Sequence, residues 1–109
     1  MGGSQLLADE VRAAVTRFPR GESFGIASQL VRAADSVGAN IAEGCGRQSS
    51  RDQVRFYNMG ISSAQETLHF LKRARGANLM DLRTYYQLTN RTSVTHSLLA
   101  ALIRTLGDQ

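Results

Sequence analysis

Arg32, Ser36, Asn40 and Glu43 recur at helical spacing in one stretch of the chain, and Arg47 follows them. Steps of three and four residues place these polar side chains on one side of a helix, opposite an apolar stripe. An ordinary solvated face carries long lysine and glutamate side chains, whereas serine and asparagine allow another element to approach closely. The row is therefore predicted to contact a loop, another subunit or a ligand phosphate.

The next stretch carries a comparable polar row that includes Glu66 and Arg73. Opposite charges at such spacings predict two ion pairs, Glu43 with Arg47 and Glu66 with Arg73. These pairs would fix helix ends and subunit contacts. Structural cross-linking is the interpretation that we favour for both rows, and direct contact with a ligand is the alternative.

Arginine dominates the positive charge of this chain. Its 13 basic and 9 acidic residues give a net charge of +4, and every basic residue except Lys72 is an arginine, whose planar fork suits phosphate and carboxylate groups. The basic residues predicted to contact RNA or DNA flank two loops and are Arg51, Arg55, Lys72, Arg73, Arg75, Arg83 and Arg91. In an antiparallel bundle the two loops lie at opposite ends, which predicts two basic patches. Repeated around a ring of subunits, each patch would suit a phosphate backbone.

Residues that could support catalysis or hold a metal are sparse. Glu66 and His69 have the Glu-x-x-His spacing of di-iron bundles, but they lie on a polar face and no second pair occurs. Cys45 has no histidine close in the sequence to activate it and is expected to be a small buried residue. Gly44-x-Gly46 follows a helix and lacks the ending of a phosphate loop. The sequence thus predicts no enzyme, metal site or cofactor.

Composition indicates one small helical domain. The 109 residues are 42% hydrophobic, with one proline and no tryptophan. A single cysteine excludes an internal disulfide, and no signal peptide or long apolar run is present, which predicts a cytoplasmic protein that contacts no membrane. Residues 1–4 are expected to be a flexible leader, and residues 5–109 the domain.

Apolar periodicity predicts four helices. The predicted helices are residues 5–18, residues 24 to about 44–46, residues 50–77 and residues 82–107. Ser23 and Asp81 are the predicted N-caps of the second and fourth helices, and Ser49 with Asp52 forms the predicted capping pair of the third. Gly76-Ala77-Asn78 is the predicted turn before the last helix. Short loops between helices that all carry apolar stripes predict an all-α, up-down-up-down antiparallel four-helix bundle.

The third predicted helix has two apolar stripes. Tyr57 and Leu71 belong to one of them, and Phe56, Met59 and Phe70 lie more than about 100° away around the helix axis. A helix with two apolar faces must bury both, so the second stripe is predicted to contact another subunit. Alternatively, the two stripes merge into one wide core face.

The motif Ser36-x-x-Ala39-Asn40-Ile41-Ala42-Glu43-Gly44-x-Gly46-Arg47 resembles the signature of a known family. This family comprises four-helix-bundle proteins related to the product encoded in intervening sequences of bacterial 23S ribosomal RNA genes. The similarity extends back through Gln29-Leu30-x-Arg32 and forward through Ser63-x-x-Glu66. The chain departs from the family pattern at Gly38, often a proline, and at Val31, often an arginine.

The resemblance implies a homo-oligomeric ring of four-helix bundles, five-fold in the family, without established catalytic activity. Distant relatives are accessory proteins of diversity-generating retroelements, which bind a reverse transcriptase and nucleic acid. The leading hypothesis is therefore a non-enzymatic oligomeric protein whose arginine-bearing surface contacts RNA or DNA. The alternative is a protein-interaction scaffold or accessory subunit, for example of a reverse transcriptase, without nucleic-acid affinity of its own.

Overall fold

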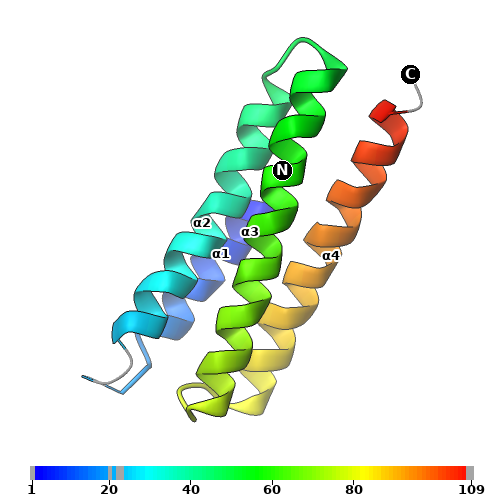
Figure 1. The fold of residues 1–109 in the computed structure, drawn as a ribbon. Coiled ribbons are helices and arrows are strands. Elements are labelled where there is room, and N and C mark those ends of the chain that lie inside the picture. The colour runs from blue at the N-terminus through cyan, green and yellow to red at the C-terminus, as the bar shows by residue number, and fades with distance from the viewer. Residues whose placement is uncertain (1, 20, 22–23, 108–109) are drawn as a thin grey trace.

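The computed structural model describes residues 2–19, 21 and 24–107, and it confirms an all-α four-helix bundle. The helices are α1 (Gly2–Val15), α2 (Phe24–Cys45), α3 (Ser50–Gly76) and α4 (Leu82–Gly107). Each runs antiparallel to the one before it (Figure 1). α2 packs against α1 and α3, and α4 packs against α3 and α1, which gives a rod of 48 × 20 × 19 Å.

The first helix differs from its predicted bounds. It begins at Gly2, three residues before the predicted start, and it ends at Val15, three residues before the predicted end. The chain after it turns through hydrogen bonds from the Arg17 and Phe18 N–H groups to the carbonyls of Ala14 and Val15. Phe18 is still buried beyond the helix end. The predicted cap Ser23 lies outside the described residues, as does Met1.

The other predicted helix signals are confirmed. The Ser49 hydroxyl accepts a hydrogen bond from the Asp52 N–H at 3.1 Å, and the Asp81 carboxylate accepts one from the Thr84 N–H at 2.7 Å. The bond from the Thr84 backbone, more than any other contact, lowers the pKa of Asp81 below its ordinary value. Asn78 reverses the chain with φ of 61°, a conformation that asparagine tolerates well.

The core is a single cluster to which all four helices contribute. Its fully or almost fully buried members include Leu7, Val11, Leu30, Val37, Tyr57, Ala64, Leu71, Leu88 and Leu99. Buried threonines satisfy their hydroxyls within their own helices, as Thr92 does by donating to the Leu88 carbonyl at 2.7 Å. None of the described helices has a stretch long and apolar enough to cross a membrane.

Glycine allows α2 and α3 to approach each other closely. A Cβ atom on Gly44 would lie 2.4 Å from the Tyr57 ring, so the ring packs directly on the α2 backbone. Farther along the contact, a Cβ atom on Gly60 would lie 3.1 Å from Leu99 of α4 and 3.7 Å from Asn40 of α2. Three helices therefore meet at Gly60. Both glycines are needed for packing and not for backbone freedom.

We expect Gly44→Ala to lower the free energy of unfolding by about 1–3 kcal/mol, because the new methyl group must displace Tyr57 or separate the helices. Urea unfolding followed by circular dichroism measures this change. Gly25→Ala is the matched control, because the same helix has nothing within 4 Å of an added Cβ there. That variant should be neutral or more stable by up to about 1 kcal/mol. Equal stability of the two variants would contradict the packing role of Gly44.

Candidate functional site

The predicted polar row on α2 faces α3 of the same chain. Arg32 Nη2 lies 2.9 Å from Glu66 Oε2, and the hydroxyls of Ser36 and Ser63 are hydrogen-bonded at 2.8 Å. Asn40 donates from Nδ2 to the Ser36 carbonyl at 2.9 Å and to its hydroxyl at 3.2 Å. We call these five residues the polar seam. The sequence predicted a loop, another subunit or a ligand phosphate as the partner of this row. In the described residues its partner is α3 of the same chain, which agrees with the structural cross-linking that we favoured but not with any of the three named partners.

One predicted ion pair is confirmed and the other is wrong. Arg47 Nη2 lies 2.9 Å from Glu43 Oε2, as predicted. Glu66 pairs with Arg32 on α2 and not with Arg73. Seven residues separate Glu66 from Arg73, which is about 10 Å along a helix, whereas Arg32 lies directly across the helix contact.

The polar seam determines how the helices align more than it stabilises them. Arg32 and Glu66 have side chains that are 55% and 39% exposed, and ion pairs in such positions contribute roughly 1 kcal/mol or less. The serine pair is half-buried and requires two small side chains to face each other. Sliding α2 along α3 would separate both pairs at once.

The end of the bundle that holds the α2–α3 loop carries Arg47, Arg51 and Arg55. The guanidinium groups of Arg47 and Arg55 lie 4.6 and 4.8 Å from the centre of the Phe56 ring. Arg47 also pairs with Glu43, and Arg55 approaches Asp52 at 4.0 Å. Within the described part of the chain, only Arg51 of these three makes no ion pair.

The opposite end of the bundle is more strongly basic. Its exposed cations are Arg17, Lys72, Arg73 and Arg83, and we call this group the basic end. None of the four makes an ion pair with another described residue. Asp81 is near enough for Arg17 and Arg83 to help lower its pKa. Arg75 is half-buried and donates to the Met80 carbonyl at 3.1 Å, so it holds the loop.

The sequence did not point to Arg17, which lies between α1 and α2. The α1–α2 and α3–α4 loops lie at the same end of an up-down-up-down bundle (Figure 1), so the predicted topology could have placed it there.

Arg91, by contrast, belongs to neither end. It lies within α4, is half-buried, and pairs with Glu10 of α1. This is a correction to the predicted basic patches, because Arg91 is not adjacent to a loop and a carboxylate already neutralises it.

The predicted α3 contact residues do not form a continuous exposed apolar surface. Phe56 is half-buried beside two guanidinium groups, and Phe70 packs against the core. Met59 is 47% exposed. The second stripe has therefore partly merged with the core face, as the alternative interpretation proposed.

Among the residues that the structure describes, histidine, cysteine, aspartate and glutamate side chains lie apart from one another. In the described ranges, no three of them come close enough together to hold a metal ion. Glu66, which has the Glu-x-x-His spacing, is engaged by Arg32 instead.

A family model described as 23S rRNA-intervening sequence protein matches residues 3–101. The chain belongs to this family. A crystal structure of a protein with unknown function from the S23 ribosomal protein family of Bacteroides thetaiotaomicron has the same fold, with a TM-score of 0.87. The two chains are 23% identical, and the alignment covers 94% of this chain and 95% of the other. Comparison with curated proteins returned no match.

The residues that resemble the family signature have structural roles in this chain. The polar seam consists of signature residues, namely Arg32, Ser36, Asn40, Ser63 and Glu66, and Gly44 lets the Tyr57 ring pack on α2. The signature ends at the C-terminus of α2, where Glu43 pairs with Arg47 and the Gly46 N–H donates to the carbonyls of Ala42 and Glu43. This part of the signature therefore encodes the α2–α3 hairpin.

Tyr57 and Cys45 are in contact beside this hairpin. Cys45 is exposed, which corrects the prediction of a buried residue; it is the last residue of α2, at the end of the bundle. The Tyr57 hydroxyl donates to Cys45 Sγ at 3.4 Å. Burial of Tyr57, together with its hydrogen bond to Cys45 and the electrostatic effect of Cys45, raises the pKa of Tyr57 to about 12.

We expect Tyr57 to make stability depend on alkaline pH. The phenol pKa is ordinarily 10.0 and is raised in the folded state, so the unfolded chain loses this proton first. The stabilising contribution is complete below pH 10 and falls as the pH rises toward 12, by as much as about 3 kcal/mol. Urea unfolding at several pH values measures the loss.

Tyr57→Phe is the control for this experiment. It should show a smaller decline in stability over the same pH range. In an ultraviolet titration it should lose the tyrosine that ionises toward pH 12. If the variant instead lost its amplitude near pH 10 and kept the part of the titration at higher pH, Tyr57 would have an ordinary pKa.

Proposed function

We propose that this protein is a non-enzymatic, homo-oligomeric, cytoplasmic protein that contacts RNA or DNA through its basic end. The observation that supports this function is the presence of four exposed cations at one end of the rod without ion pairs in the described structure. Cations that are already paired gain little from a phosphate, whereas unpaired ones can release counterions from the nucleic acid.

The chemistry of the basic end suits a phosphate backbone. Three of its four cations are arginines, which can hold phosphate oxygens with two parallel hydrogen bonds. Arg73 also lies beside Gly25 and Ile26 in the first turn of α2, where the helix dipole adds positive potential. In an oligomer the ends of several rods would combine into one larger cationic surface.

We expect the triple variant Lys72→Gln, Arg73→Gln, Arg83→Gln to bind a fluorescent single-stranded RNA about tenfold or more weakly than wild type at low salt. Fluorescence anisotropy measures the affinity. The wild-type affinity should fall steeply as salt rises, and the variant should show a shallower salt dependence.

The matched control is Arg47→Gln, Arg51→Gln, Arg55→Gln, which removes the same charge from the opposite end. We expect a change of less than about threefold, because two of these three arginines are paired. Absence of wild-type binding at low salt would refute the nucleic-acid function. Equal losses in the two triple variants would show that net charge, and not the basic end, governs binding.

A second candidate function is a protein-interaction scaffold or accessory subunit of a nucleic-acid enzyme such as a reverse transcriptase. It is favoured by Val94, Leu98 and Leu102, which expose apolar side chains on α4. A protein with this function alone would give no anisotropy change with RNA at any salt concentration.

A further inference from the structure

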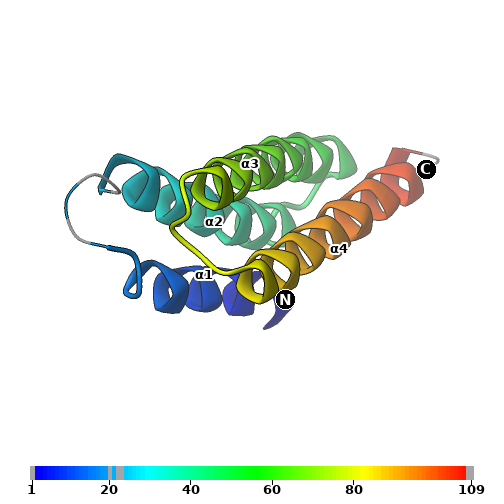
Figure 2. The ribbon, with the colours of Figure 1, turned by 90° about the horizontal axis from the view of Figure 1, so that it is seen from below.

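Two aromatic rings of this protein are strongly exposed, and both lie at the basic end. Phe24, the first residue of α2, is 79% exposed, and Tyr86, in the second turn of α4, is 61% exposed. Every other phenylalanine and tyrosine that the structure describes is buried or half-buried. Figure 2 shows this end of the bundle, at which α2 and α4 both begin. The end that carries the unpaired cations therefore also presents flat apolar surfaces.

Phe24 borders an apolar groove between the end of α1 and the start of α2. The groove has a volume of about 540 Å³, and Ser28 has the only polar side chain among the described residues that line it. Phe18, in the turn after α1, and Val31 of α2 are among its apolar lining residues. Cavities of about 300–1,000 Å³ hold small organic ligands. The groove therefore has room for a flat ring that lies against Phe24.

Unpaired cations lie on both sides of Phe24. Arg17 directly precedes Phe18 of the groove, and it makes no ion pair with another described residue. On the α3 side of α2, Arg73 lines a second hollow together with Gly25, which follows Phe24 in the chain. A ligand that enters the apolar groove can therefore place negative groups beside it on either side.

Positive charge continues from the groove toward Tyr86. Arg17 and Arg83 both act electrostatically on Asp81, so the two arginines lie near one another across the start of α4. Arg83 precedes Tyr86 by three residues, and this spacing places the two side chains on the same side of α4. The path across the basic end thus begins and ends with an exposed aromatic ring and has cations between.

Aromatic rings that alternate with cations suit single-stranded nucleic acid. Unpaired bases stack on the rings, and the phosphates between them are neutralised by arginine and lysine. A duplex keeps its bases stacked in its interior, so it would contact the cations and leave both rings in water. Each nucleotide of a single strand carries a negative group and a flat apolar face, which is the combination that this end offers.

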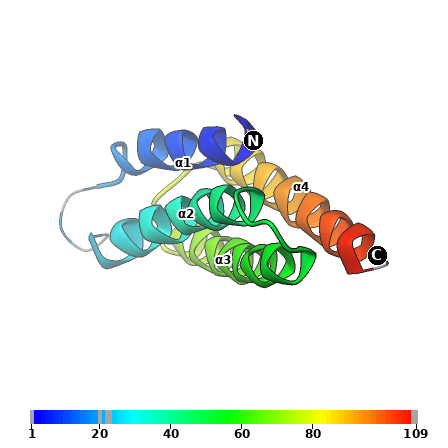
Figure 3. The ribbon, with the colours of Figure 1, turned by 90° about the horizontal axis from the view of Figure 1, so that it is seen from above.

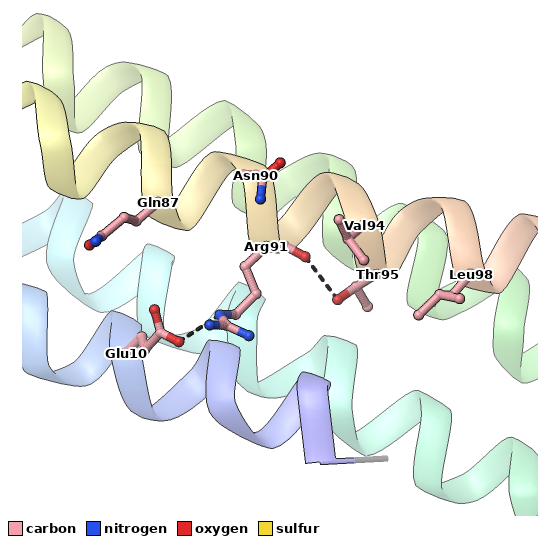
Figure 4. Close-up of a pocket in the computed structure, with 7 residues that line it drawn as sticks. All are labelled: Glu10, Gln87, Asn90, Arg91, Val94, Thr95 and Leu98. Carbon is pink, nitrogen blue, oxygen red and sulfur yellow. Dashed lines mark hydrogen bonds and ion pairs between the residues drawn. The ribbon is translucent and has the colours of Figure 1, made fainter.

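Other surfaces of the described structure lack this combination. Figure 4 shows the groove between α1 and α4, where Arg91 already reaches Glu10, and none of the described residues that line this groove is aromatic. The opposite end of the bundle, which holds the α2–α3 loop, is shown in Figure 3. Its aromatic residue Phe56 is half-buried and already lies beside two guanidinium groups.

We propose that the basic end binds single-stranded RNA or DNA by stacking unpaired bases on Phe24 and Tyr86. One base occupies the groove beside Phe24, and Arg17, Arg73 and Arg83 hold the phosphates along the path to Tyr86. This inference rests on the proposed function, because it requires nucleic acid at the basic end, and it adds which strands bind and which rings hold them. Discrimination between base sequences is weak, because every base has a flat face.

Fluorescence anisotropy with a single-stranded RNA and with the duplex of the same sequence tests the proposal. Phe24→Ala and Tyr86→Ala should each weaken binding of the single strand about fivefold or more, because each removes a stacking surface. Both variants should bind the duplex within about twofold of wild type. The salt dependence of single-strand binding should stay as in wild type, because no phosphate contact is removed.

Leu82→Ala is the matched control. Leu82 is the first residue of α4 and is 49% exposed, so this variant removes exposed apolar area from the same end without removing a ring. It should bind the single strand within about twofold of wild type. Phe24→Tyr keeps a ring and should retain the wild-type affinity, whereas Phe24→Leu should lose as much as Phe24→Ala. Circular dichroism of all these variants should match that of wild type, because the altered side chains are exposed.

The outcomes separate this inference from the proposed function. If wild type binds both nucleic acids and neither Phe24→Ala nor Tyr86→Ala weakens binding of the single strand, stacking is overturned and the nucleic-acid function stands. Equal losses for the single strand and the duplex would also overturn stacking. Absence of wild-type binding to either nucleic acid at low salt overturns both proposals, and binding of polyglutamate in their place would identify an acidic protein as the partner.

Discussion

The close contact between α2 and α3 is the constraint on which the rest of the bundle depends. The Tyr57 ring rests on the backbone at Gly44, and farther along the contact Ser36 bonds Ser63 at 2.8 Å. Both contacts require small residues on facing positions, so they specify one alignment of the two helices. Gly60 then lets Leu99 of α4 pack against this pair, which positions the fourth helix.

Several charged residues pair with each other between helices, and this pairing determines where unpaired charge is left on the surface. Arg32, Glu66 and Arg91 are engaged along the sides of the rod, so little free charge is left there. The unpaired cations lie mainly where helices end, and the end that carries Arg17 and Arg83 holds more of them than the other. The molecule thus carries most of its unpaired cations at one end and a line of exposed apolar side chains, Val94, Leu98 and Leu102, on α4.

This separation is compatible with two functions in one small chain. Exposed apolar side chains can bind a protein surface without opposing its net charge, while the ends remain available to a polyanion. Assembly would multiply a modest number of cations into a larger surface and raise affinity through simultaneous contacts. The physical properties of the two surfaces differ, because salt would weaken contacts made by unpaired cations far more than contacts made by exposed apolar side chains.

The sequence by itself determined the four helices, most of their ends and the residues that resemble the family signature. Periodicity fixes which way a side chain points from its own helix, and Ser49 and Asp81 mark helix starts chemically. Only the tertiary structure decided that Glu66 meets Arg32, that Arg91 meets Glu10, and that Leu98 stays uncovered. These outcomes depend on which helix lies opposite and how far it extends, and periodicity within one helix carries no information about either.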